Sequence, residues 1–123
     1  MGAINLELSA GHFSEAQSPF LSAHRVSEIL GINQSELAKL IGVARNTLTA
    51  KSGARKVDQA LSPVVRILAM VTEMTGDECR AVIWFKHQPI PGWAGKTAFD
   101  LVGEGKADKV LAYLEAVRSG VYA

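Results

Sequence analysis

Cysteine is almost absent from this sequence of 123 residues, and the sequence also lacks a long hydrophobic run. Cys79 is the single cysteine, which excludes an internal disulfide and favours a reducing compartment. No apolar stretch approaches the roughly 20 residues that a membrane-spanning helix needs. The first residues lack the basic segment and the long apolar segment of a signal peptide. We therefore expect a cytoplasmic protein that does not bind a membrane.

Residue patterns that support catalysis or metal binding are also missing. His12, His24 and His87 are widely separated, and with one cysteine they provide no metal-ligand spacing. No glycine-rich loop follows a segment with strand character, so the usual fingerprint of nucleotide binding is absent. Asp77 and Glu78 mark an expected helix start and not a catalytic pair. We expect a binding protein that is not an enzyme and that uses no metal and no cofactor.

Positive and negative charges nearly balance over the whole chain, but they are unevenly distributed along it. The formal net charge is only +1, which by itself does not indicate a nucleic-acid-binding protein. Between Lys39 and Lys56 there are five basic residues and no acidic one, whereas the rest of the chain holds eight basic and twelve acidic residues. A local basic stretch favours contact with phosphates. The alternative interpretation is a solvated helix face.

Helical periodicity dominates the sequence, since no segment alternates polar and apolar residues over the length of a strand. With 48% hydrophobic and 20% charged residues, the chain is typical of one or two small folded domains, and we expect an all-α fold. A mixed, weakly patterned arm precedes the helices at residues 1–21. Capping residues, prolines and glycines delimit the predicted helices, which cover residues 22–30, 34–41, 44–51, 62–75, 77–87, 97–102 and 105–118.

Two of these boundaries depend on proline. Ser62-Pro63 predicts a helix start, because Ser is a good N-cap and Pro suits the first helical position. Residues 88–95 contain two prolines and two glycines, which predicts a shaped loop between helices.

The segment 34–48 has the pattern of a helix-turn-helix. Leu37, Ala38 and Ile41 fall on one face of its first helix. Gly42 follows the last of them, where the chain must leave the helix with a positive φ. A second helix packed against the first would then present its polar side outward. This layout predicts a device that places one helix in the DNA major groove.

The outward residues of this segment are candidates for DNA contact. Arg45 can reach a guanine edge and Asn46 an adenine, whereas threonines suit phosphate contacts. Amides at the start of the preceding helix also favour a phosphate, although helix capping explains Ser35 nearly as well. The predicted DNA-binding residues are Gln34, Ser35, Arg45, Asn46, Thr47, Thr49 and Lys51.

The second half of the chain has a distinctive order of features. A helix end with two aromatic residues is followed by the proline–glycine loop, a short capped segment and a charged helix. The residues that carry this order are Trp84-Phe85, Gly95-Lys96-Thr97-Ala98-Phe99-Asp100-Leu101 and the final Ser119-Gly120-Val121-Tyr122-Ala123. The order resembles the toxin-binding domain of the Xre/MbcA/ParS antitoxins, and residues 22–56 resemble the Xre-type helix-turn-helix that precedes it. We therefore expect an arm at 1–21, a helix-turn-helix domain at 22–61 and a toxin-binding domain at 62–123.

This resemblance implies a function. Antitoxins of this family bind and neutralise RES-domain toxins, which consume NAD or ADP-ribosylate a target, by covering the toxin's NAD-binding cleft. They also repress their own operon through DNA binding, and they commonly form homodimers. The expected partners are thus a cognate RES-domain toxin, operator DNA and a second copy of the chain. The alternative is a stand-alone helix-turn-helix transcription regulator whose C-terminal half serves for dimerisation or for sensing a small ligand.

Candidate toxin contacts come from the loop and the end of the chain. Trp93 lies in the loop, where an aromatic residue favours a partner contact, whereas Trp84 and Phe99 are expected in the core. The terminal tail combines apolar side chains with a carboxylate and could enter a cleft built for an anionic dinucleotide, although terminal tails are usually disordered. The predicted toxin-binding residues are Trp93, Lys96, Arg118, Val121, Tyr122 and Ala123.

Several positions depart from the family pattern or have a second interpretation. Lys96 and Ala98 stand where this family often has Arg and Pro, and a lysine lacks the bidentate donors of an arginine. After the recognition helix many Xre repressors carry an acidic residue and then Gly, whereas this chain has Lys51-Ser52-Gly53. Arg118 could pair with the toxin, or it could instead interact with the last carbonyls of its own helix.

Overall fold

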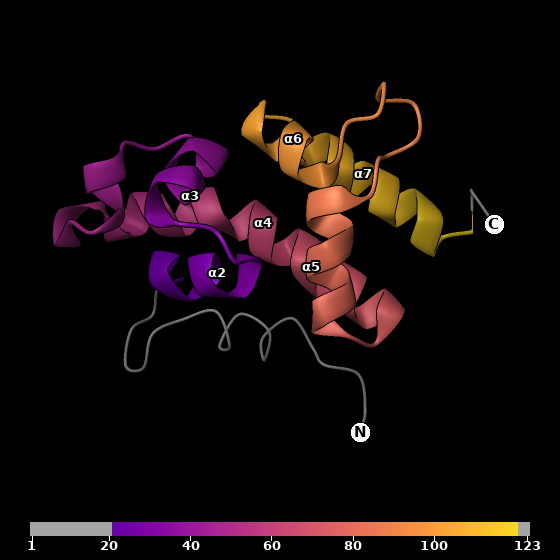
Figure 1. Ribbon diagram of the computed structural model, residues 1–123, viewed down its shortest axis with the longest axis horizontal. Helices are drawn as coiled ribbons and strands as arrows, with labels where there is room; N and C mark the ends of the chain where they lie inside the picture. The colour runs from indigo at the N-terminus through magenta and orange to yellow at the C-terminus, as the bar shows by residue number, and fades with distance from the viewer. Residues whose placement is uncertain (1–20, 121–123) are drawn as a thin grey trace.

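The computed structural model describes residues 21–120 of the protein, and every regular element in this range is helical (Figure 1). This confirms the predicted all-α fold. Within the described range there is no β-strand, and Pro89 and Thr97 form an isolated antiparallel bridge. None of the described helices is long and apolar enough to cross a membrane. The elements are α2 (Ala23–Leu30), α3 (Gln34–Ile41), η1 (Arg45–Leu48), η2 (Lys51–Gly53), α4 (Ala54–Thr75), α5 (Glu78–His87), α6 (Ala98–Gly103) and α7 (Ala107–Arg118).

The first two helices begin and end where their capping residues predict. The Ser22 side chain accepts a hydrogen bond from the Arg25 amide, and Gly31 ends α2 with a φ of 67°. Asn33 and Glu36 form a reciprocal capping box at the start of α3, with N···O distances of 2.8 and 3.2 Å. On α3, Leu37, Ala38 and Leu40 are buried while Ile41 is only partly buried. The predicted buried face was therefore correct for Leu37 and Ala38, but its third fully buried residue is Leu40 and not Ile41.

The predicted α-helix over residues 44–51 was wrong. The chain instead forms two short 3₁₀ turns, η1 and η2, separated by Thr49 and Ala50. Asn, Thr and Ser are weak helix formers because their side chains compete for backbone hydrogen bonds. The Thr49 hydroxyl does this when it donates to the Asn46 carbonyl at 3.4 Å. Neither 3₁₀ turn contains a buried residue, so little packing energy opposes these local preferences.

The predicted helix start at Ser62-Pro63 was also wrong. Helix α4 begins at Ala54 and runs for 22 residues with Pro63 inside it. Proline removes one helical hydrogen bond, at a typical cost of about 3 kcal/mol. Burial on both sides of Pro63 offsets this cost, because Leu61 and Val64 are completely buried and Leu68 nearly so. The helix is therefore continuous across residue 61, where the boundary between two domains was predicted.

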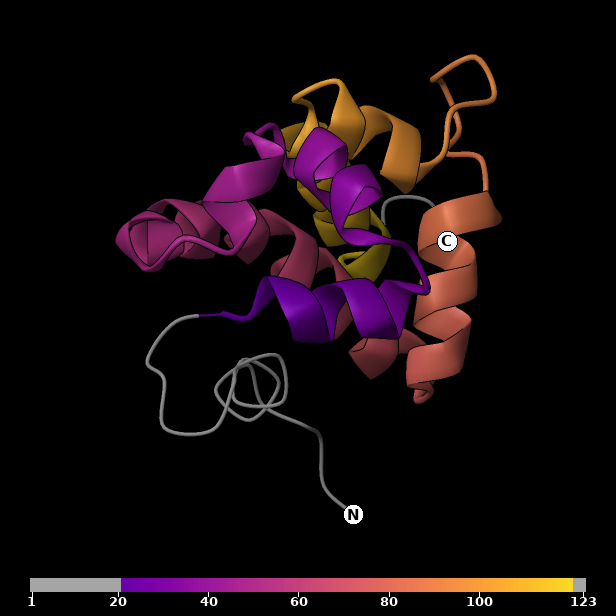
Figure 2. The same ribbon diagram turned by 60° about the vertical axis from the view of Figure 1, so that its left-hand side comes forward.

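Helix α4 is the centre of the fold. It packs against α2, η1 and η2 near its start and against α5 and α7 farther along. Helix α3 also contacts α6 directly (Figures 1 and 2). The Lys86 ammonium of α5 donates to the Leu30 carbonyl at the end of α2, at 2.9 Å. Buried residues from α2 to α7 consequently belong to one hydrophobic cluster.

The helices of the second half follow their predicted caps. The Asp77 carboxylate accepts from the Cys79 amide at 2.8 Å and begins α5, while Thr97 and Asp100 form a capping box that begins α6. Between them, residues 88–97 form the predicted irregular loop, which is anchored by Ile90 at 2% exposure. Helix α7 begins at Ala107, two residues after its predicted start at Gly105.

The aromatic core differs from the expectation in one respect. Phe85 is fully buried and meets the Phe99 ring edge-on, with ring centroids 6.0 Å apart. Trp84 and Phe99, which were expected in the core, are only partly buried and pack against its outside. An aromatic ring at the edge of a cluster buries one face and leaves the other accessible.

Candidate functional site

One end of the molecule carries a continuous set of exposed polar and basic residues, which we call the basic face. It is built by η1, η2 and the first turn of α4, at the far left of Figure 1. This segment holds no acidic residue, and the next one along the chain is Asp58, whose carboxylate accepts a hydrogen bond from the Leu21 amide. Within the segment, the exposed members of the basic face are Arg45, Asn46, Thr49, Lys51, Arg55 and Lys56.

The seven predicted DNA-binding residues do not all reach the surface equally. Ser35 is exposed at the start of α3, whereas Gln34 is partly buried and its Oε1 has no hydrogen-bond partner among the described residues. Thr47 is also partly buried and lies against Gly53. Arg55 and Lys56 were not in the predicted set, although the charge count had already placed them in the basic stretch. Their exposure adds two cations beside Lys51.

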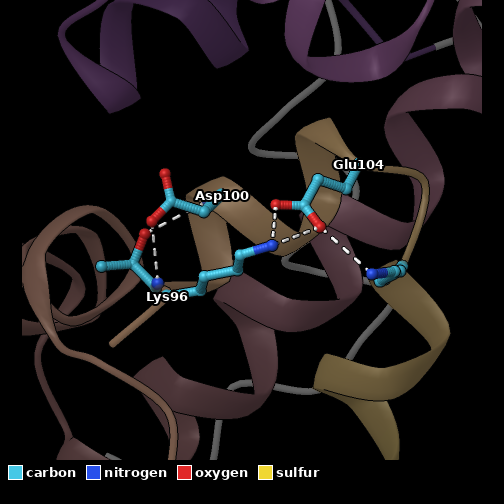
Figure 3. A network of polar contacts seen from close by, with 5 residues as sticks. Lys96, Asp100 and Glu104 are labelled. Atoms are coloured by element: carbon cyan, nitrogen blue, oxygen red, sulfur yellow. Dashed lines mark hydrogen bonds and ion pairs between the residues drawn. The ribbon is translucent and has the colours of Figure 1, made fainter. Parts of the chain in front are cut away.

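A second group of polar residues forms where the loop meets the junction of α6 and α7. The Lys96 ammonium lies 2.7 Å from Glu104 Oε2, and the Lys106 ammonium lies 3.1 Å from Glu104 Oε1. Figure 3 shows the Glu104 carboxylate turned toward Lys96. The Lys106 ammonium also sits 5.5 Å from the centroid of the Trp93 ring, within the range of a cation–π interaction. We call Trp93, Lys96, Glu104 and Lys106 the loop cluster.

The electrostatics of the loop cluster follow from these contacts. The hydrogen bond from Lys96, followed by that from Lys106, lowers the pKa of Glu104. Two ammonium groups face one carboxylate, so the cluster keeps one net positive charge at neutral pH. Trp93 is partly buried, which leaves part of its indole accessible beside that charge. The arrangement suits an anionic partner that also offers an apolar contact.

Of the predicted toxin-binding residues, the structure brings Trp93 and Lys96 together and places Arg118 elsewhere. The Arg118 guanidinium donates to both carboxylate oxygens of Glu115, at 2.6 and 2.7 Å. This hydrogen-bonded pairing raises the pKa of Arg118. Residues Val121, Tyr122 and Ala123 lie outside the described residues. Glu104 and Lys106 were missed because their relation to Trp93 arises only when the loop closes onto α6.

Comparison with known families matches two successive parts of the chain. Residues 12–65 match the antitoxin Xre-like helix-turn-helix domain, and residues 70–120 match the antitoxin Xre/MbcA/ParS C-terminal toxin-binding domain. The chain belongs to the Xre/MbcA/ParS antitoxins. The basic face lies within the first matched region, and the loop cluster lies within the second. Neither a curated protein nor a solved structure matches the chain.

The two matched domains indicate two partners for the antitoxin. A helix-turn-helix domain indicates DNA as one partner, and a toxin-binding domain indicates a toxin as the other. The described part of the antitoxin contains no group of three metal-ligating side chains close enough to hold an ion. Its two matched regions are binding domains that meet in one fold.

Proposed function

We propose that this antitoxin neutralises a RES-type toxin encoded beside it, by covering the cleft in which that toxin holds NAD. The proposal is supported by the presence of a partly exposed cationic and aromatic cluster within the matched toxin-binding domain. A cleft that holds a dinucleotide recognises pyrophosphate oxygens and flat rings. A blocking protein needs an apolar anchor to fill such a cleft and charges that complement its rim.

The loop cluster supplies both parts. Trp93 provides a rigid aromatic surface, and Lys106 beside its ring keeps a positive charge at the same place. Lys96 and Arg118 each have a carboxylate partner within the chain, so they are held in place before the toxin arrives. Val121, Tyr122 and Ala123 add an apolar plug that enters the cleft. Inhibition is steric, and the antitoxin performs no chemistry of its own.

We further propose that the antitoxin represses its own operon as a homodimer on operator DNA. The basic face supports this part, because Lys51, Arg55 and Lys56 are exposed beside Arg45 and Asn46. The three neighbouring cations suit phosphates, which position the protein, while Arg45 and Asn46 suit guanine and adenine edges, which specify sequence. A protein that binds through such contacts loses affinity steeply as salt increases.

Co-expression with the product of the adjacent gene tests the proposal. We expect growth arrest when that product is expressed alone, rescue by the antitoxin, and a stable complex in size-exclusion chromatography with light scattering. A RES-type product that is toxic and is neutralised by this chain supports the toxin assignment. A non-toxic product that forms no complex would instead favour a stand-alone transcription regulator.

Removal of residues 121–123 separates the plug from the rest of the binding surface. We expect the truncated antitoxin to inhibit the toxin at least about tenfold more weakly, as the loss of a central anchor does. Its operator affinity should remain unchanged, which serves as the internal control for folding. Equal inhibition by the truncated and the complete chain would refute the plug.

A further inference from the structure

Two large hydrophobic side chains are exposed among the described residues, and both belong to the matched toxin-binding region. Ile83, on the outer side of α5, is 60% exposed, and Met74, near the end of α4, is 40% exposed. The inner side of α5 is fixed by Ala81 and Phe85, which are fully buried. Ile83 therefore lies outside the core, and neither the basic face nor the loop cluster uses it.

A shallow hollow lies beside Ile83. It has a volume of about 230 Å³ and is lined by Arg80, Ile83, Trp84, His87 and Gln88. The first four of these residues are spaced at i, i+3, i+4 and i+7, so they form one stripe along α5. The Arg80 guanidinium lies 3.8 Å from the Asp77 carboxylate of the same helix, so its charge already has a partner. A hollow with an aliphatic wall, an aromatic wall and a paired guanidinium at its rim suits an apolar side chain.

The hollow is next to the loop that carries Trp93. Gln88, which lines the hollow, is the first residue after α5 and begins this loop, and Figure 1 shows the loop leaving that end of the helix. The hollow and the loop cluster therefore belong to neighbouring parts of one surface within the matched toxin-binding region.

The area of the loop cluster indicates that a toxin must contact more than this cluster. A standard stable interface buries roughly 800 Å² of each partner and involves about 20–30 residues on each side. The loop cluster supplies four side chains. A toxin that covers them in a stable complex must extend over the neighbouring surface, where the hollow beside Ile83 offers an apolar contact.

We propose that the hollow beside Ile83 receives an apolar side chain of the cognate toxin, and that Ile83 itself becomes buried in the complex. The proposal rests on toxin neutralisation as part of the proposed function, but not on the RES identity of the toxin. Interfaces concentrate their affinity in a few buried apolar anchors, which charged groups surround. Helix α5 then contributes apolar burial, whereas Lys96 and Lys106 of the loop cluster contribute charge complementarity.

Ile83→Asp tests this contact, with the affinity of the full chain for the purified product of the adjacent gene measured by titration calorimetry. We expect toxin affinity to fall at least about tenfold, because a buried aspartate loses its hydration and gains no partner. Ile83→Leu keeps an apolar side chain and should bind within about threefold of the unchanged chain.

Met74→Asp is the matched control. It makes the same kind of change at the other exposed hydrophobic side chain, which does not line the hollow, and it should bind the toxin as the unchanged chain does. Circular dichroism and operator affinity should be the same in all of these chains, because both positions are exposed and lie outside the basic face.

Salt separates the α5 contact from the loop cluster. Lys106→Ala removes one cation from the loop cluster, so the resulting loss of toxin affinity should shrink as salt is raised from about 0.05 M to about 0.5 M. The loss caused by Ile83→Asp should persist over the same range, because salt does not screen the cost of desolvating the carboxylate.

The outcomes distinguish failure of the α5 contact from failure of the proposed function. Normal toxin binding by Ile83→Asp, together with weakened binding by Lys106→Ala, would overturn the α5 contact and leave the proposed function in place. An equal loss for Met74→Asp would also overturn the contact, since the toxin would then respond to any added charge on this half. An unchanged chain that forms no complex would overturn both. If Ile83→Asp impaired only the pairing of two antitoxin copies, the hollow would belong to that pair and the toxin contact would be wrong.

Discussion

At the scale of single residues, the geometry of the basic face depends on Gly53. A Cβ atom at this position would lie 2.7 Å from the Thr47 carbonyl oxygen and 2.8 Å from the Thr47 methyl group. The φ of Gly53 is −92°, so any residue could adopt its backbone conformation, and space alone requires glycine. The side-chain methyl could rotate away, but the backbone carbonyl cannot. Gly53 thereby holds η2 against η1.

Gly53→Ala should lower the free energy of unfolding by about 1–3 kcal/mol, as overpacking of a close contact does. The same substitution at Gly103 is the control, because a Cβ there meets no atom within 4 Å and alanine favours a helix. Urea denaturation of both variants measures the difference. If both variants unfold at the same urea concentration, the contact with Thr47 does not limit this position.

Arg45→Ala should weaken operator binding by about 1–3 kcal/mol and relax base preference at one position, if Arg45 reads a guanine. Arg66→Ala is the control, since Arg66 is an exposed arginine in the middle of α4 and lies outside the basic face. Fluorescence anisotropy with DNA from upstream of the gene gives both affinities. An equal loss for the two variants would show only a general dependence on charge, and no loss for Arg45 would mean that the recognition face lies elsewhere.

At the scale of elements, features set by neighbouring residues were predicted correctly, whereas features set by contacts between distant residues were not. The caps at Ser22, Asn33, Asp77 and Thr97 act over two or three residues, so the sequence alone predicts them. Pro63 could not be assigned to a helix interior from sequence, because the burial that offsets its lost hydrogen bond comes from other elements packed around α4. The helix predicted over 44–51 failed for a related reason, since apolar spacing indicated a helix in a segment that has no fully buried residue.

The candidate surfaces show the same limit. Exposed residues of the basic face could be predicted, because a run of cations without acids is a property of neighbouring residues. The contact of Trp93 with Lys106 could not be predicted, because Trp93 precedes α6 in the chain and Lys106 follows it. The Lys96 partner is eight residues away, at no spacing that a loop favours.

The loop cluster also predicts a dependence of stability on pH. Folding lowers the pKa of Glu104 through Lys96 and Lys106, so the ionised carboxylate stabilises the fold at neutral pH. That contribution is lost as the pH falls through the lowered pKa. Glu104→Gln should therefore be slightly less stable than the unchanged chain at pH 7, and this gap should close once the pH has fallen below the lowered pKa of Glu104. The effect is small because the pair is exposed.

Urea denaturation at pH 7 and at acid pH measures this gap. The control is the same substitution in a chain that carries Lys96→Met and Lys106→Met. In that chain Glu104 has lost both cations, and Glu104→Gln should change stability equally at the two pH values. A gap of the same size at every pH would show that the carboxylate acts through packing and not through its charge.

At the scale of the whole molecule, the two matched domains share one core and one helix. Helix α4 crosses from one matched region into the other, α3 contacts α6, and Lys86 binds the end of α2. Independent domains are usually separated by an exposed linker of polar or flexible residues. Helix α4 runs through the place where such a linker would lie between the two matched regions. We therefore expect a single cooperative unfolding transition, in which any loss of packing in one half lowers the stability of the other.

Leu30→Ala tests this coupling, because Leu30 is completely buried on α2 while both tryptophans, Trp84 and Trp93, lie in the second half. The substitution should remove about 2–5 kcal/mol of stability by leaving a cavity. If the molecule is one cooperative unit, tryptophan fluorescence must report that loss in full, at the same midpoint as the helical signal. Ser35→Ala, at an exposed position of α3, should shift neither signal. If the halves were independent, the fluorescence midpoint of Leu30→Ala would match that of the unchanged chain, while the helical signal would be lost at a lower urea concentration. Toxin binding could then proceed on a chain whose DNA-binding half is unfolded.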